Sequence, residues 1–256
     1  MSFFRIDQNQ TLYYQSIQGK AELPNLVFLH EGLGCCSMWG DFPGQLCGLT
    51  GCRGLVYDRS GYGKSSPCNQ TRTIHYLHDY ALQELPLLLN GVIPETPYIL
   101  VGHSDGASIS LLYGSQRPVL LRGIIAEAAH VFVEPTTISG IKSTEKAWFD
   151  GKMKNLTKYH GDKTEWVFKA WSQTWLQPWF SHWNIEYLLP SITVPLLVIQ
   201  GKNDQYGSPA QAEAIAANTS GVARLEMIEG SGHVPHTDAQ QYVLKIMADF
   251  IKMITR

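Results

Sequence analysis

One stretch, residues 98–106 with the sequence Y-I-L-V-G-H-S-D-G, constrains the fold of this chain more than any other. Residues 99–101 are an apolar run typical of a short buried strand, and residues 107–113 have the composition of a packed helix. Between them, the pattern G-x-S-x-G places Ser104 on a sharp strand-to-helix turn. Its glycines leave room for the helix, and the strained turn exposes the serine hydroxyl as a nucleophile. The alternative is a glycine-rich turn whose serine only caps the helix.

Apolar runs and helical periodicities alternate along the rest of the chain. Further strands are predicted over residues 26–30, 54–58, 123–129, 196–200 and 225–228, and helices over 37–46, 74–89, 210–217 and from about 238 onward, after an N-terminal hairpin over 3–18. Pro86 is expected to kink the helix that contains it. Strands alternating with helices predict an α/β fold with a mostly parallel sheet covered on both faces. Ligands of such sheets bind outside the carboxyl ends of the strands.

The segment over residues 134–187 differs in composition, because six of the seven tryptophans lie in it. It separates two predicted strands, so we expect an inserted helical cap (lid) over the carboxyl ends of the sheet, within an α/β core formed by residues 1–133 and 188–256. Most of its indole rings are expected to fill the cap's own core, and some to face the cleft. The candidate substrate-binding residues around the cleft are His130, Trp148, Trp171 and Trp175.

A serine hydroxyl needs a base to take its proton, and that base needs an acid to hold it in one tautomer. The order serine, acid, histidine is one of the known arrangements of such triads. Asp204 comes four residues after the predicted strand over 196–200, and His233 closely follows the strand over 225–228. Both lie on loops at the carboxyl edge that carries Ser104. We therefore predict a catalytic triad of Ser104, Asp204 and His233.

Three other sets of residues are weaker candidates for these roles. His236 follows His233 by three residues, but a proline intervenes. Asp58 also ends a strand, yet it precedes the serine in the chain. His75 and His78 are spaced like a metal pair on a helix, but no carboxylate or cysteine cluster completes a site. A solvated helix face is expected for these two histidines, and no metal or cofactor is predicted.

Composition and charge exclude several classes of partner. The formal net charge is -2 and no basic run is present, which argues against nucleic acid and anionic membranes. No apolar stretch approaches the 18 residues of a membrane span, and the first residues lack the apolar region of a signal peptide. The five cysteines, an odd number without zinc spacing, suit a reducing compartment. These features predict a cytoplasmic protein, and they leave its oligomeric state open.

Five short motifs make the chain resemble the α/β-hydrolase superfamily over nearly its full length. They are L-H-E-G-L-G at 29–34, Y-D-R-S-G-Y-G at 57–63, G-H-S-D-G at 102–106, G-K-N-D at 201–204 and G-S-G-H at 230–233. The resemblance implies a sheet of the eight-stranded type and an oxyanion hole. In relatives, the loop after the first buried strand gives one backbone N–H to that hole. Here the implied donor is Gly32, with Leu33 second, paired with the N–H of Asp105.

Two acidic residues bear on the substrate. Glu31 stands where relatives usually have glycine. Its carboxylate could bind a cationic group of the substrate. An ion pair with Arg59 or Lys64 is favoured, because a buried unpaired carboxylate is costly. The Ser-Asp-Gly elbow is similar to that of valacyclovir hydrolase, an amino-acid ester hydrolase, which implies that Asp105 anchors a substrate amine. The alternative is that Asp105 caps the following helix.

The reaction expected of this chain is acyl transfer to water on a small carboxylic ester, without a cofactor. A thioester, a lactone or the carbon–carbon bond of a ring-cleavage product is an alternative substrate for the same triad. A non-catalytic small-molecule receptor is the alternative from another class, because a fold does not by itself fix a function.

Overall fold

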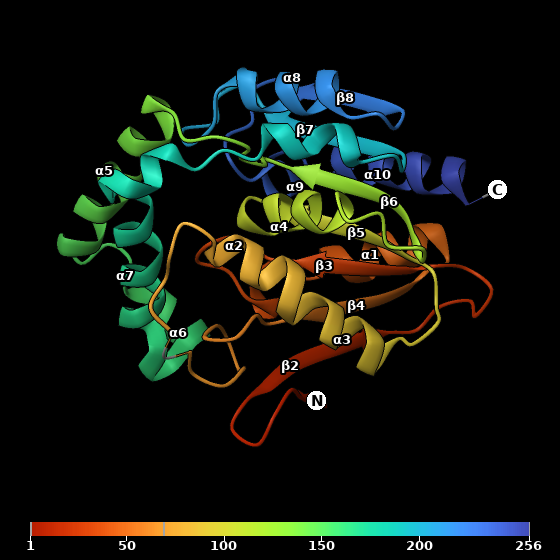
Figure 1. The fold of residues 1–256 in the computed structure, drawn as a ribbon, viewed down its shortest axis with the longest axis horizontal. Coiled ribbons are helices and arrows are strands. Elements are labelled where there is room, and N and C mark those ends of the chain that lie inside the picture. Colours follow the sequence, from red (N-terminus) through yellow and green to blue (C-terminus); the bar gives the residue numbers. More distant parts are fainter. Residues whose placement is uncertain (1, 69, 256) are drawn as a thin grey trace.

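The computed structural model describes residues 2–68 and 70–255, and an eight-stranded sheet forms its centre (Figure 1). The strands are β1 (Ser2–Arg5), β2 (Thr11–Ile17), β3 (Asn25–Leu29), β4 (Arg53–Tyr57), β5 (Tyr98–His103), β6 (Leu121–Glu127), β7 (Leu196–Gly201) and β8 (Ala223–Ile228). Their order across the sheet is β1-β2-β4-β3-β5-β6-β7-β8. The β1–β2 and β2–β4 pairs are antiparallel, and the other pairs are parallel. The predicted α/β fold is confirmed.

Helices cover both faces of the sheet (Figure 1). One face carries α1 (Phe42–Thr50) and α10 (Gln240–Ile254), which pack on each other and on the strands. The other face carries α2 (Tyr76–Asp79), α3 (Leu85–Val92), α4 (Asp105–Gly114) and α8 (Pro209–Asn218). The short α9 (Pro235–Asp238) leads into α10.

The central strand β3 shows how the sequence specifies these two layers. All five of its residues are buried, and successive side chains point to opposite faces. Leu26 and Phe28 therefore join the core under α1 and α10, whereas Val27 and Leu29 join the core under α4. Each such side chain contributes roughly 1.5–3 kcal/mol of burial free energy. The carboxyl ends of β3 and its neighbours are thereby held in one fixed edge, where the functional loops begin.

Two helices differ in detail from the sequence prediction. The helix expected over 37–46 is a 3-10 turn, η1 (Cys36–Trp39), followed by α1. In place of a simple kink at Pro86, a π-helical turn, η2 (Tyr80–Glu84), joins α2 to α3. Pro86 has no N–H to give to the preceding turn and its ring crowds the carbonyl four residues earlier, so a wider turn relieves the crowding there.

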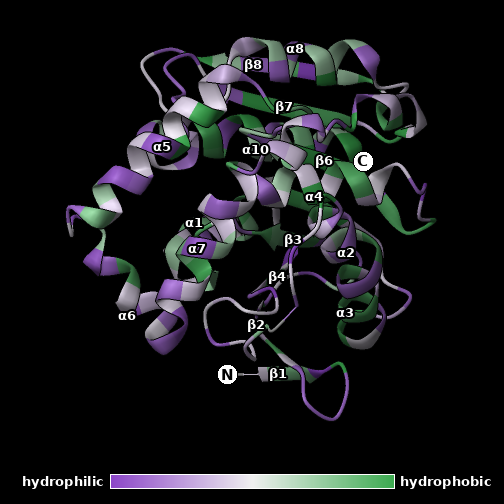
Figure 2. Cartoon of the chain, turned by 60° about the vertical axis from the view of Figure 1, so that its left-hand side comes forward, coloured by the Kyte–Doolittle hydropathy of each residue, from purple (hydrophilic) through white to green (hydrophobic). Residues whose placement is uncertain are grey.

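A helical insertion, defined as α5 to η6, connects β6 to β7, and its helices α5, α6 and α7 lie at the left in Figure 1. Its elements are α5 (Pro135–Phe149), η3 (Lys154–Leu156), α6 (Thr157–His160), η4 (Gly161–Lys163), α7 (Thr164–Trp175), η5 (Pro178–His182) and η6 (Glu186–Ser191). Figure 2 colours the central strands as hydrophobic and α5 as largely hydrophilic. Trp175, Phe180 and Trp183 pack together inside the insertion. Within the described residues, no helix is both long and apolar enough to cross a membrane.

Candidate active site

Ser104 occupies the sharp turn between β5 and α4. Its backbone has φ +53° and ψ −118°, a strained conformation for a residue with a side chain, and its N–H donates to the Glu127 carbonyl at 2.9 Å. A Cβ on Gly102 would collide with the backbone of Gly106, and a Cβ on Gly106 would collide with the backbone of Leu29. The two glycines of the motif are therefore required by close packing of the turn against its neighbours.

The structure brings Ser104, His233 and Asp204 into one hydrogen-bonded chain. Ser104 Oγ lies 2.9 Å from His233 Nε2, and His233 Nδ1 lies 2.9 and 2.8 Å from the two carboxylate oxygens of Asp204. Because a carboxylate only accepts, the imidazole proton resides on Nδ1 and leaves Nε2 free to accept from the serine hydroxyl. This is the geometry in which a histidine can act as a general base toward a serine.

Asp204 is held in place by neighbours other than His233. Gln200 Nε2 donates to Oδ2 at 2.7 Å, and the N–H groups of Tyr206 and Gly207 donate to Oδ1 at 2.8 and 3.2 Å. Burial acts to raise the pKa of Asp204, but hydrogen bonding and attraction to His233 outweigh it, and the pKa lies below its ordinary value. Asp204 is therefore a fixed negative charge behind the imidazole.

His103, the residue before the serine, supports the His233 loop and was not identified from the sequence. Its Nε2 donates to the His233 carbonyl at 2.7 Å, and its Nδ1 lies 3.6 Å from Glu31 Oε2. Burial opposes a charge on His103, but the carboxylates of Glu31 and Glu127 outweigh it and raise the pKa to about 9. His103 is thus a buried imidazolium.

The ion pair predicted between Glu31 and Arg59 or Lys64 is wrong, because the Glu31 carboxylate faces His103 instead. The guanidinium of Arg59 is directed elsewhere: Nη1 lies 3.7 Å from Asp105 Oδ2, and Nη2 donates to the Glu31 carbonyl at 2.7 Å. Despite burial, attraction to His103 lowers the pKa of Glu31 to about 2. Glu31 therefore has His103 as its cationic neighbour, and Asp105 has Arg59.

The side chain of Asp105 is engaged with the core. The Tyr76 hydroxyl donates to Asp105 Oδ2 at 3.0 Å, and Trp175 Nε1 donates to the Tyr76 oxygen at 2.8 Å. Among the described residues, no backbone N–H of α4 donates to the Asp105 carboxylate, so the helix-cap interpretation is not supported. The Arg59 guanidinium lies near the same oxygen, so its positive charge balances the negative charge of the carboxylate.

The loop that follows β3 borders the same cavity as Ser104. Gly32 and Leu33 line the same cavity as Ser104 and Asp105. The loop is fixed by a hydrogen bond from the Gly34 N–H to the Glu31 carbonyl at 3.1 Å. The Trp171 ring lies directly on Gly32, where it leaves no room for a Cβ.

The cavity above Ser104 has a volume of about 310 Å³ and is lined by both the core and the helical insertion. Its residues are Glu31, Gly32, Leu33, Met38, Ser104, Asp105, His130, Thr137, Ile141, Met153, Leu156, Trp171, Trp175, Gln205, Tyr206, His233 and Val234. Of the predicted substrate-binding residues, the structure does not bring Trp148 to this cavity. Its ring stacks instead on Phe168 at 4.2 Å between centroids, inside the insertion.

His130 lies in the wall of this cavity, with its ring centroid 5.8 Å from that of His233. Its Nε2 is 3.1 Å from the Tyr206 carbonyl, to which it donates. Burial is the main cause that lowers the pKa of His130, and the neighbouring His233 lowers it further. A neutral imidazole therefore forms this part of the cavity wall.

The weaker candidates have structural partners away from Ser104. His236 Nδ1 lies 2.8 Å from Glu127 Oε2, and Asp58 accepts from the Cys36 N–H at 2.6 Å and the Lys64 N–H at 2.7 Å. Among the described residues, no group of His, Cys, Asp or Glu could hold a metal ion. Burial raises the pKa of the Cys35 thiol to about 12, so it is unreactive at neutral pH.

Comparison with known proteins agrees with the fold. The model of the alpha/beta hydrolase family matches residues 26–245, so the chain belongs to this family. It is 24% identical to a proline iminopeptidase of Saccharolobus solfataricus over 95% of this chain and 89% of that protein. It is 23% identical to an sn-1-specific diacylglycerol lipase of Mus musculus over 94% and 85% of the two chains. The crystal structure of an enol-lactonase from Burkholderia xenovorans has the same fold, with a TM-score of 0.74, 17% identity and coverage of 98% and 99%.

Proposed function

We propose that this alpha/beta hydrolase cleaves a small, uncharged carboxylic ester through an acyl-enzyme on Ser104. One observation carries the proposal: the Ser104–His233–Asp204 hydrogen-bonded chain lies at the floor of a largely apolar cavity. A diacylglycerol lipase and an enol-lactonase, two of the similar proteins, are named for reactions at ester bonds, which also supports an ester.

In the first half-reaction His233 Nε2 takes the proton of Ser104 Oγ while the oxygen attacks the ester carbonyl carbon. The N–H groups of Gly32 and Asp105 would stabilise the oxyanion, and Asp204 would stabilise the imidazolium. The imidazolium then gives its proton to the alkoxide leaving group. The alcohol departs and the acyl group stays on Ser104.

In the second half-reaction water attacks the acyl-enzyme, and His233 acts again as the base. Collapse of the tetrahedral intermediate releases the carboxylic acid and returns the proton to Ser104 Oγ. Every proton and electron pair is accounted for by these three residues and water, so the reaction as written uses no metal or cofactor.

The preference for an uncharged substrate follows from the charges around the cavity. Glu31 faces the His103 imidazolium, and Asp105 faces Arg59 and the Tyr76 hydroxyl. Neither carboxylate is left to balance a substrate amine, and binding one would displace an existing partner. The remaining wall is mostly apolar, with Trp171 and Trp175 among its side chains, and suits a short aliphatic or aromatic acyl or alcohol part.

A fluorophosphonate probe combined with an ester panel tests the proposal. We expect labelling at Ser104, its loss in Ser104→Ala and His233→Ala, and turnover of p-nitrophenyl acetate or butyrate. Thioesters, lactones and amino-acid esters belong in the same panel, because they test the alternative substrates. A protein that takes no label and turns over nothing, yet gains thermal stability from a small ligand, would be a receptor instead.

A further inference from the structure

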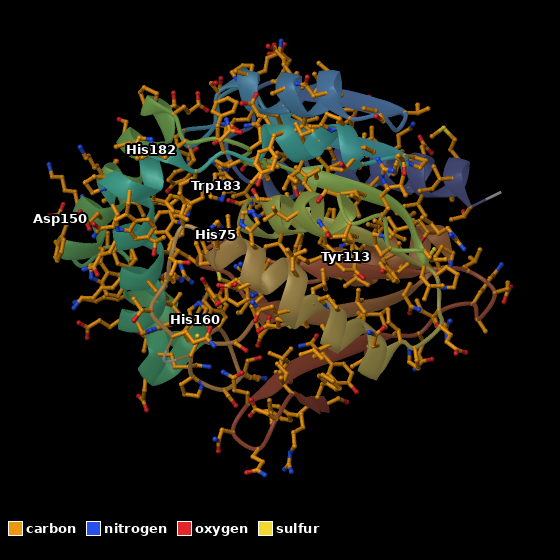
Figure 3. All side chains as sticks on the ribbon, viewed as in Figure 1. His75, Tyr113, Asp150, His160, His182 and Trp183 are labelled. Carbon is orange, nitrogen blue, oxygen red and sulfur yellow. The ribbon has the colours of Figure 1, made fainter. Side chains whose placement is uncertain are left out.

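One histidine of the helical insertion bridges two loops of the core. His160, at the end of α6, is buried, and the Gly63 N–H donates to its Nδ1 at 3.0 Å. Its Nε2 lies 2.9 Å from the Leu33 carbonyl. Figure 3 shows His160 on the side of the insertion that is turned toward the core. The bridge therefore joins the insertion to the loop that carries the expected oxyanion donors.

The two hydrogen bonds define the protonation state of His160. A backbone N–H can only donate, so Nδ1 must accept and the single ring proton sits on Nε2, which donates to Leu33. Only the neutral ring fits this arrangement. Burial is the main cause that lowers the pKa of His160, and Lys163 lowers it further, whereas the hydrogen bond to Leu33 and the charges of Asp58 and Glu31 oppose them.

The effect of His160 reaches Gly32 through two peptide planes. A trans peptide is planar, so its C=O and N–H point in opposite directions. When His160 holds the Leu33 carbonyl, the Gly34 N–H of the same peptide is directed to the Glu31 carbonyl, where it donates at 3.1 Å. The Glu31 carbonyl in turn shares a peptide plane with the Gly32 N–H. Arg59 Nη2 donates to the same Glu31 carbonyl at 2.7 Å from the core side. Fixing Leu33 therefore adds a second restraint, from the side of the insertion, on the direction of the Gly32 N–H.

We infer that His160 is a positioning residue of the oxyanion hole, which helps to hold the Gly32 N–H toward the oxyanion while the helical insertion is docked on the core. This inference rests on the proposed hydrolysis at Ser104. It makes the insertion part of the catalytic apparatus as well as a wall of the cavity, since undocking α6 would release Leu33 and disorganise the hole.

A pair of amide substitutions separates the two hydrogen bonds of the ring. The amide NH₂ of Gln reaches the position of Nε2 and can donate to Leu33, whereas the amide of Asn reaches only the position of Nδ1. We expect His160→Gln to keep kcat within about threefold of the wild type. His160→Asn should lower kcat about 10- to 100-fold with KM within about threefold, which is the effect of a poorly held oxyanion donor. His160→Phe, which keeps the ring packing and removes both bonds, should behave like His160→Asn.

Lys163→Met is the matched control. Lys163 also ties the insertion to the core, through the carbonyls of Tyr62 and Ser65, but it does not touch the oxyanion loop. Its loss should lower the melting temperature and leave kcat within about twofold. Wild-type turnover and fluorophosphonate labelling are measured first, because their absence would refute the hydrolase proposal and not the role of His160. With an active wild type, equal kcat values for the folded Gln variant and either the Asn or the Phe variant would overturn the inference.

Discussion

The partly exposed Glu31 and the buried His103 form an ion pair beside Ser104, with 3.6 Å between Oε2 and Nδ1. The pair links the loop after β3 to the end of β5. His103 in turn donates a hydrogen bond to the His233 carbonyl. The distance is too long for a hydrogen bond, so the attraction between the charges is what joins the two groups. The charge of Glu31 in the loop after β3 therefore helps to hold the loop that carries His233.

This pair predicts that stability falls in alkaline solution. The pKa of His103 is about 9 in the folded protein, above its ordinary value near 6.5, so its contribution is complete below pH 6.5 and is lost as the pH rises through 9. We expect the free energy of unfolding, measured with urea, to decrease by at most about 3 kcal/mol between pH 6.5 and 9.5. Glu31→Gln should reduce that decrease, and the exposed Glu229→Gln should not. Parallel pH curves for the wild type and Glu31→Gln would contradict the prediction.

Replacing Asp204 by Asn should lower kcat about 10⁴-fold while the protein stays folded. The amide can donate to His233 Nδ1, which would shift the ring proton to Nε2 and block its role as a base. The measurement is the steady-state hydrolysis of a p-nitrophenyl ester, with circular dichroism to verify folding. Asp249→Asn, which breaks only an exposed pair with Lys245 on α10, serves as the control. A kcat reduction below about tenfold in Asp204→Asn would argue against the triad.

The order of strands and loops could be predicted from the sequence because it depends on short-range patterns. Apolar runs specify β5, β7 and β8, and parallel strands place their following loops at one edge of the sheet, which is why Ser104, Asp204 and His233 could be predicted together. The partner of Glu31 could not be predicted. Which carboxylate faces His103 depends on how two loops lie over the strand ends, and no local pattern encodes that.

Side-chain directions in the helical insertion were equally hidden. Trp148 and Trp171 are both tryptophans of the predicted helical cap, yet Trp148 stacks on Phe168 and Trp171 lies on Gly32. The difference arises from the crossing of α5 and α7, which sequence spacing does not determine. No sequence pattern indicated a role for His160, since its contacts with Leu33 and Gly63 span 127 and 97 residues of sequence.

The Asp105 side chain is predicted to contribute mainly to the stability of the folded protein, and not to substrate selectivity. Arg59 is fully buried, so Asp105→Ala would leave a cation without its carboxylate and should lower the free energy of unfolding by about 3–5 kcal/mol. The hydrolysis rates for an amino-acid ester and for a neutral ester of equal size should fall by the same factor. Urea unfolding and paired rate measurements test both parts. A selective loss of the amino-ester rate would instead mean that Asp105 anchors a substrate amine.

Trp171 and Gly32 offer a test of the contact between the helical insertion and the oxyanion loop. A methyl group at Gly32 has no space because the Trp171 ring occupies it, so Gly32→Ala must displace either the ring or the loop. We expect this variant to lose about 100-fold in kcat, as for a removed oxyanion donor. Trp171→Ala alone should keep most of the activity and accept longer acyl chains, because it enlarges the cavity.

In the double variant of Gly32→Ala and Trp171→Ala the methyl group gains room, so the kcat lost in Gly32→Ala should be partly restored. The sign of the coupling in this double-mutant cycle, measured on p-nitrophenyl acetate and octanoate, decides whether the ring and the loop act together.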